Sequence, residues 1–181
     1  MTPTPFAEQI ADWHDFYAAV TGMAATLVGL LFVGLGLNPG VMVAGSPTGL
    51  RVLAGQTFHN FLIILVIAVV ALIPEPSADV LAITLLVVGV QGVLLVGRDL
   101  YRTLTDADRE WSRLRTLSRH AAPAVAYAFA LWVGFDLLDG RSDDLGAIVV
   151  TIFLLLISAS VNCWEILAAI GERRSQGDSG S

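Results

Sequence analysis

The sequence predicts an all-α fold: a polytopic membrane protein in which a bundle of five transmembrane helices crosses the bilayer. It contains five apolar runs, each near the roughly 20 residues that a helix needs to span the hydrocarbon core, and we expect the spans at about 16–37, 52–73, 78–98, 121–138 and 145–170. Charged residues make up only 14% of the chain, whereas soluble domains usually carry about a quarter. We therefore expect residues 1–171 to form a single membrane domain.

The orientation follows from the arginine residues, because positive charges concentrate in the cytoplasmic connections of membrane proteins. The chain has ten arginines and no lysine. With the N-terminus outside and the C-terminus in the cytoplasm, only Arg141 lies outside. The connection between the third and fourth spans, with its borders, holds the predicted cytoplasmic basic surface: Arg98, Arg102, Arg109, Arg113, Arg115 and Arg119.

A short interfacial helix is expected before the first span, because Pro5 suits a first helical position and Phe6, Ile10 and Trp13 recur at helical spacing. In the first span, small residues fall near one face, and in hydrocarbon such a face lets another helix approach closely. This predicted small-residue face consists of Ala18, Gly22, Ala25 and Gly29. We expect it to make the closest helix–helix contact in the protein or its oligomer.

The first span also resembles a known group of sequences. The segment Asp15-Phe16-Tyr17, the small residues that follow it, the run from Gly29 to Val33 and then Asn38 carry the resemblance. They are similar to the first span of a loose group of uncharacterised multi-spanning membrane proteins of high-GC bacteria. The resemblance implies the membrane class and brings no activity with it.

The later elements follow from turn and capping residues. The segment 74–77, Pro-Glu-Pro-Ser, is typical of a tight hairpin between the second and third spans, and Pro123 is expected near the start of the fourth. Thr105 and Asp108 resemble a capping box for a cytoplasmic helix near 106–120. That segment is either an amphipathic helix on anionic lipid headgroups or an extension of the flanking spans. The polar residues 172–181 are expected to form a disordered tail.

Polar side chains inside the spans are expected to gather in one layer. At 1.5 Å per residue from the cytoplasmic ends of their helices, His59 and Gln91 lie about 10 Å deep, and Asn60 and Asn162 about 12 Å. The full predicted layer is Gln56, His59, Asn60, Gln91, Ser158, Asn162 and Glu165. It is either a vestibule open to the cytoplasm, with Glu165 and His59 as candidate ion or proton groups, or a set of interhelical hydrogen bonds that fixes which helices are neighbours.

Glu165 is the only acidic residue assigned inside a span, and an unpaired carboxylate would be costly there. We expect it to bond Gln91, His59 or Arg98, or to stay protonated. His120 is expected at an interface, in contact with water. The outer halves of the second and third spans, residues 63–73 and 80–90, carry only Thr84 as a polar side chain. A continuous aqueous path through one protomer is therefore not expected.

The sequence contains no HExxH or GxSxG motif. Cys163 is the only cysteine, which excludes an intramolecular disulfide and a CxxC metal site. We predict no enzymatic activity, no cofactor, no bound metal and no nucleic-acid partner. The expected partners are the lipid bilayer and either further copies of the chain or a larger membrane complex.

The arginine-only usage, with abundant Ala, Val, Gly and Leu, is typical of a GC-rich bacterial genome, and it predicts a multi-pass protein of the bacterial cytoplasmic membrane. The preferred role is a non-enzymatic accessory, scaffold or modulator module, in which the small-residue face and the polar layer serve helix packing. The alternative is a homo-oligomeric channel or cation/proton pathway, in which symmetry brings several copies of the polar layer together.

Overall fold

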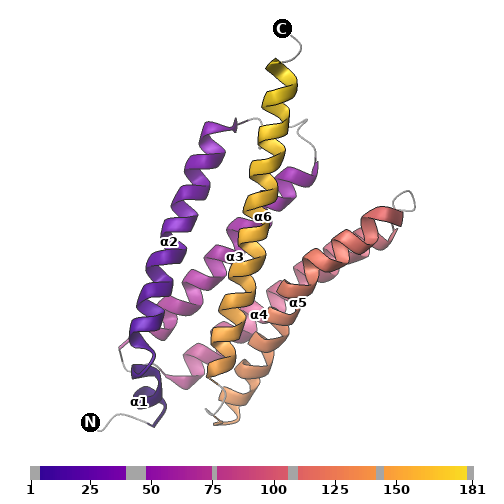
Figure 1. The fold of residues 1–181 in the computed structure, drawn as a ribbon. Helices are drawn as coiled ribbons and strands as arrows, with labels where there is room; N and C mark the ends of the chain where they lie inside the picture. Colours follow the sequence, from indigo (N-terminus) through magenta and orange to yellow (C-terminus); the bar gives the residue numbers. More distant parts are fainter. Residues whose placement is uncertain (1–4, 40–47, 75–76, 106–109, 142–144, 179–181) are drawn as a thin grey trace.

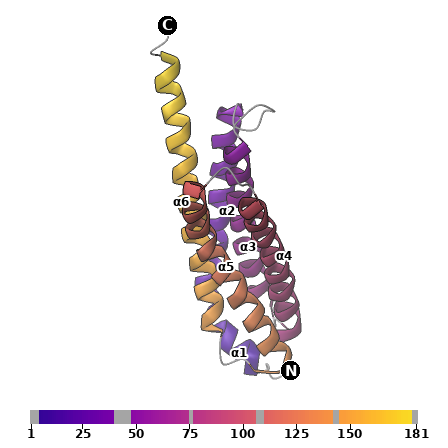
Figure 2. The same cartoon turned by 90° about the vertical axis from the view of Figure 1, so that its right-hand side faces the viewer.

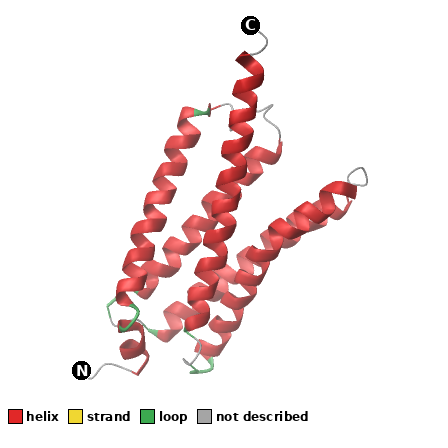
Figure 3. Ribbon diagram, viewed as in Figure 1, coloured by secondary structure: helices red, strands yellow, loops and turns green. Residues whose placement is uncertain are grey.

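The computed structural model describes residues 5–39, 48–74, 77–105, 110–141 and 145–178, and these residues form an all-helical bundle (Figure 3). In chain order the helices are α1 (Pro5–Ala11), α2 (His14–Leu37), α3 (Thr48–Ala71), α4 (Ala78–Thr105), α5 (Glu110–Leu138) and α6 (Gly146–Asp178).

Five of these helices are long and apolar enough to cross a membrane, which confirms the predicted fold class. The candidate spans are His14–Leu37, Leu50–Ala71, Ala78–Tyr101, His120–Leu138 and Gly146–Gly171. Apolar runs of this length become helices in a bilayer because only a helix satisfies every backbone polar group of an isolated segment there. The odd number of spans puts the two termini at opposite ends of the bundle (Figure 1). The chain is therefore a multi-pass membrane protein.

The predicted interfacial helix is present as α1, which folds against the end of the bundle where the chain begins. Its Phe6 and Ile10 are buried and join the main core. The backbone N–H of Trp13 then donates to the carbonyl of Ile10 at 2.9 Å, in the turn that leads directly into α2.

The closest approach between described helices is made by α4 and α5, which also share the most extensive contact surface in the bundle. A Cβ added at Gly92 would overlap the ring of Tyr127, and one at Gly89 would lie 2.6 Å from Cγ of Leu131. From the other side, a Cβ at Gly134 would lie 2.8 Å from Cγ of Leu86. The glycines thus allow bulky side chains of the facing helix to press against backbone.

The small-residue face of α2 does not make this contact within one chain, so that part of our expectation is wrong. Its four residues, Ala18, Gly22, Ala25 and Gly29, are all exposed. A Cβ added at either glycine would meet nothing within 4 Å. The buried side of α2 consists of Tyr17, Val20 and Ala24, and the extensive contact of α2 is with α3. A contact of this face in an oligomer remains a prediction.

The helix expected near 106–120 takes the form of an extension of the spans. Helix α4 continues past its span to Thr105, and α5 runs without interruption from Glu110 through Pro123 to Leu138. Residues 106–109 lie outside the described part of the chain. In Figure 1 the ends of α4 and α5 at this connection diverge from α6. Of the predicted basic surface, only the side chain of Arg98 is described, and it is exposed.

The expected disordered tail is wrong for most of its length. Helix α6 continues to Asp178, and in both side views it projects beyond the other helices (Figure 1, Figure 2). The polar residues after Gly171 extend an existing helix and need no new nucleus, which is the costly step in helix formation. The last three residues, 179–181, lie outside the described part.

Helix α5 ends in a specific cap before the connection to α6. Gly140 adopts a left-handed backbone conformation with φ of 77°, which glycine tolerates without steric cost. Its N–H donates to the carbonyl of Leu137 at 3.1 Å, and the N–H of Arg141 donates to the carbonyl of Asp136 at 2.9 Å. The Arg141 guanidinium also pairs with the Asp136 carboxylate at 2.7 Å, which fixes the connection further.

Candidate functional site

The predicted polar layer forms two separate arrangements that meet at Asn60. The first is a buried hydrogen-bond network that joins α3, α5 and α6. The hydroxyl of Tyr127 donates to Oδ1 of Asn60 at 3.1 Å, and Nδ2 of Asn60 donates to Oγ of Ser158 at 3.4 Å. Asn60 is only 1% exposed and Tyr127 only 2%, so this network lies inside the bundle and links the three helices.

Asn162 and Thr151 extend the polar character of α6 on the same side as Ser158. Asn162 is fully buried, and its Nδ2 has no hydrogen-bond partner among the described residues. The hydroxyl of Thr151 donates to its own helix, to the carbonyl of Ala147 at 3.0 Å, and lies 3.5 Å from the carbonyl of Ala126 on α5. Of these contacts, only the one to Ala126 crosses between helices, and it links α6 to α5 through a backbone acceptor.

The second arrangement is a polar cavity of about 430 Å³ between α3 and α4, with Tyr127 of α5 at its back. Four residues of the predicted layer line it: Gln56, His59, Asn60 and Gln91. Nε2 of His59 is buried without a partner among the described residues. The remaining lining residues are Val52, Gly55, Leu95, Val96, Arg98 and Asp99. We refer to this space as the α3–α4 cavity.

The mouth of the α3–α4 cavity carries both signs of charge. Arg98 Nε lies 3.8 Å from the Asp99 carboxylate, and the other carboxylate oxygen of Asp99 lies 4.0 Å from Nε2 of His120. His120 is only 8% exposed, so the expectation that it contacts water at the interface is wrong. It is buried because α5 packs this turn against α4 beside Asp99.

The α3–α4 cavity ends inside the bundle. Beyond His59 on α3, the next inward positions are Ile63, Ile64 and Ile67, all buried. On α4, Leu85 and Val88 are likewise buried beyond Gln91. The cavity is consequently blind among the described residues, as expected from the apolar outer halves of these spans.

Glu165 is not part of the α3–α4 cavity. It lies half-buried on α6, whereas the cavity residues come from α3, α4 and α5. The predicted pairing of Glu165 with His59 as candidate ion groups is therefore not assembled in this cavity. Helical phase on α6 correctly grouped Ser158 with Asn162, but it did not reveal which neighbouring helix each residue faces.

Two functional positions were missed at the sequence level. Tyr127 lines the α3–α4 cavity and also donates to Asn60. The sequence could have revealed it, because Tyr127 lies in the middle of a span, far from the interfaces where aromatic residues are common. A tyrosine hydroxyl at that depth needs a polar partner. Gly92 was missed as well, and it allows the Tyr127 ring to lie directly against α4.

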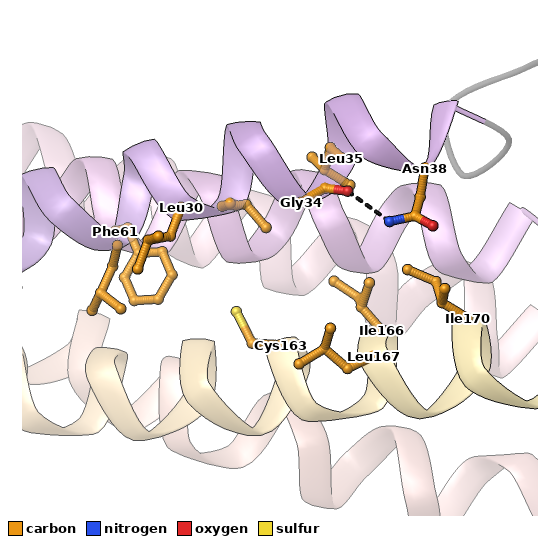
Figure 4. A pocket seen from close by; sticks show the side chains of 11 residues that line it. Leu30, Gly34, Leu35, Asn38, Phe61, Cys163, Ile166, Leu167 and Ile170 are labelled. Atoms are coloured by element: carbon orange, nitrogen blue, oxygen red, sulfur yellow. Dashed lines mark hydrogen bonds between the residues drawn. The ribbon is translucent and has the colours of Figure 1, made fainter.

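A second, apolar space lies between α2 and α6, and Phe61 of α3 contributes to its wall (Figure 4). This α2–α6 groove has a volume of about 190 Å³. The side chain of Cys163 points from α6 toward α2 in Figure 4, and Asn38 marks one end, where its Nδ2 donates to the carbonyl of Gly34 at 2.9 Å. The other lining residues are Leu27, Leu30, Leu31, Leu35, Ile166, Leu167 and Ile170.

Comparison of the chain with protein-family models, with curated proteins and with solved structures finds no match. Within the described part of the chain, no group of three or more His, Cys, Asp or Glu side chains is placed to hold a metal ion. The function has to be argued from the geometry of the two spaces and of the exposed helix faces.

Proposed function

We propose that this multi-pass membrane protein is a non-enzymatic accessory module of the bacterial cytoplasmic membrane, which binds a larger membrane protein through the small-residue face of α2. The observation that carries the proposal is the unusual exposure of α2. Among the described elements, its extensive contacts are with α3, and of its residues only Tyr17, Val20 and Ala24 are buried.

The small-residue face suits such an association because close helix packing in hydrocarbon depends on small side chains. Gly22 and Gly29 have open space where a Cβ would lie, so a partner helix can approach the α2 backbone there. The packing of the chain itself does not need this face. A second copy of the chain could occupy it in place of a different protein, and the test separates these outcomes.

The experiment is purification of the chain from its native membrane in a mild detergent, followed by measurement of the mass of the intact complex. We expect a single copy of this chain together with a larger partner, and we expect Gly22→Leu to remove that partner. Gly34→Leu is the matched control, because it adds the same side chain to α2 on the side that faces the α2–α6 groove. A bare monomer, or equal loss of the partner in both variants, would contradict the proposal.

A second candidate function is a homo-oligomeric cation or proton pathway, and the α3–α4 cavity is the observation that favours it. The cavity holds Gln56, His59 and Gln91 and carries Arg98 and Asp99 at its mouth. Its apolar inner end counts against conduction through a single chain, so this function requires a ring of copies.

The oligomeric pathway predicts a ring-sized complex and cation or proton flux in liposomes made from the purified protein. His59→Gln should reduce this flux without changing the mass of the complex if the cavity is on the path. Glu165→Gln should do the same if the carboxylate on α6 contributes. A monomeric mass together with no flux would exclude this candidate.

A further inference from the structure

The α2–α6 groove lies between two helices that make few direct contacts with each other. Near the starts of α2 and α6, the rings of Phe16 and Phe153 have centroids 6.4 Å apart. Farther along, the groove lies between the two helices, with Phe61 of α3 in its wall (Figure 4). There, Leu35 of α2 packs against a smaller buried cluster formed by Leu53, Ala54 and Ile166.

The lining of the groove selects an apolar occupant. The described lining is apolar except at Asn38, which carries an amide side chain. The Nδ2 of Asn38 already donates to the Gly34 carbonyl. A buried water molecule needs two to four polar partners, which this surface does not provide. An empty groove would forfeit dispersion contacts along its walls. In a bilayer, an acyl chain needs no polar partner and can fill the groove, so it is the occupant that fits.

The length of the groove matches one leaflet. From Leu27 to Asn38 the lining follows α2 over twelve residues, and the eleven steps between the first and the last span about 16 Å at 1.5 Å per residue. Half of a hydrocarbon core of roughly 30 Å is about 15 Å. The groove begins near the bilayer centre and ends at the surface that the arginine distribution assigns to the cytoplasm.

Three arginines lie near that end of the groove by their positions in the chain, with Glu172 as the one acidic residue among residues 171–174. Arg51 is exposed near the start of α3, two residues before Leu53 of the buried cluster. On α6, Arg173 and Arg174 follow Ile170, the last lining residue, by three and four positions. Three to four positions correspond to about 5–6 Å along a helix. The phosphate of a phospholipid lies at about this distance beyond the end of its acyl chains.

From the apolar lining, the one-leaflet length and this charge, we propose that the α2–α6 groove is a binding site for one acyl chain of an anionic phospholipid, whose phosphate lies at the level of Arg173 and Arg174. Each basic residue near an anionic surface favours association, and the groove adds the chain-specific contacts. The site lies on the side of α2 opposite the small-residue face and does not depend on the proposed partner.

The test is native mass spectrometry after reconstitution of the full chain in vesicles of equal parts phosphatidylglycerol and phosphatidylcholine and extraction into a mild detergent. We expect the wild-type protein to retain one phosphatidylglycerol molecule in preference to phosphatidylcholine. Gly34→Leu should lower this retention about tenfold, the effect of losing the burial of roughly two methylene groups. A Cβ at Gly34 meets nothing within 4 Å, so the leucine enters the groove without displacing a helix.

Gly36→Leu is the matched control. It adds the same side chain at nearly the same depth, about 200° around α2 from Gly34 at 100° per residue, and its position is also open. It should retain phosphatidylglycerol like the wild type. Cys163→Phe fills the groove from the α6 wall and gives the same loss if Gly34→Leu does not fold.

Each outcome decides one part of the proposal. Equal retention by the wild type, Gly34→Leu and Cys163→Phe would overturn the groove as the binding site. Equal retention of phosphatidylglycerol and phosphatidylcholine by the wild type would overturn the anionic headgroup. Loss of the preference in a variant with Arg173→Gln and Arg174→Gln, with one lipid still bound, would support the assignment of the phosphate.

Discussion

The contact between Gly92 and Tyr127 should be the most sensitive point of the bundle to a single added methyl group. A Cβ at Gly92 would overlap the Tyr127 ring, and Tyr127 is almost completely buried. The ring cannot retreat freely, because its hydroxyl donates to Asn60 at 3.1 Å. Gly92→Ala should therefore push α4 away from α5 or break the hydrogen bond between α5 and α3.

Three contributions determine how much Gly92→Ala should change the free energy of unfolding. Forcing extra atoms into a packed core costs about 1–3 kcal/mol, and loss of an interhelical hydrogen bond in a membrane protein costs on average about 0.6 kcal/mol. Alanine in a helix interior is more favourable than glycine by about 1 kcal/mol. We expect Gly92→Ala to lower the free energy of unfolding by about 1–2.5 kcal/mol.

Gly97→Ala is the matched control on the same helix. A Cβ at Gly97 meets nothing within 4 Å, so only the helix-propensity gain applies to it. Comparison of the two variants cancels that gain and leaves a difference of about 1.6–3.6 kcal/mol. Unfolding in mixed detergent micelles, followed by circular dichroism, measures both free energies. Equal stability of the two variants would refute the close approach of α4 and α5 at this point.

Three further predictions concern the polar groups. In a cysteine-free background, Gln56→Cys should react with a charged, membrane-impermeant thiol reagent supplied from the cytoplasmic side, whereas Ile64→Cys should not; equal reactivity would contradict a blind, wet cavity. Asn60→Leu should lower the free energy of unfolding by about 1–2 kcal/mol, because two interhelical hydrogen bonds are lost, and an unchanged unfolding transition would show that the network contributes nothing. Arg141→Ala should cost less than about 1 kcal/mol despite the 2.7 Å contact with Asp136, since the guanidinium is largely exposed, and a larger loss measured by the same unfolding assay would mean that this pair is effectively buried.

For the polar layer, the depth of a residue along its helix predicted some neighbours but not others. Counting residues from the cytoplasmic ends placed His59 and Gln91 at one level, and both line the α3–α4 cavity. The same argument put Glu165 in the layer as well, but the cavity excludes it. Depth along a helix is fixed by sequence position, whereas the direction of a side chain around the helix selects its neighbour, and that neighbour depends on how all the helices pack.

The sequence by itself determined the number and bounds of the membrane spans, because the length of an apolar run and the need to satisfy its backbone in hydrocarbon are local properties. It also predicted the apolar end of the cavity from the outer halves of two spans. Only the tertiary structure decided which small residues lie at a close contact. The stripe on α2, including Gly22, is exposed, whereas Gly92 meets Tyr127. In hydrocarbon, apolar faces gain nothing from leaving the solvent, so pairing depends on the fit between two helix surfaces, which neither sequence segment contains alone.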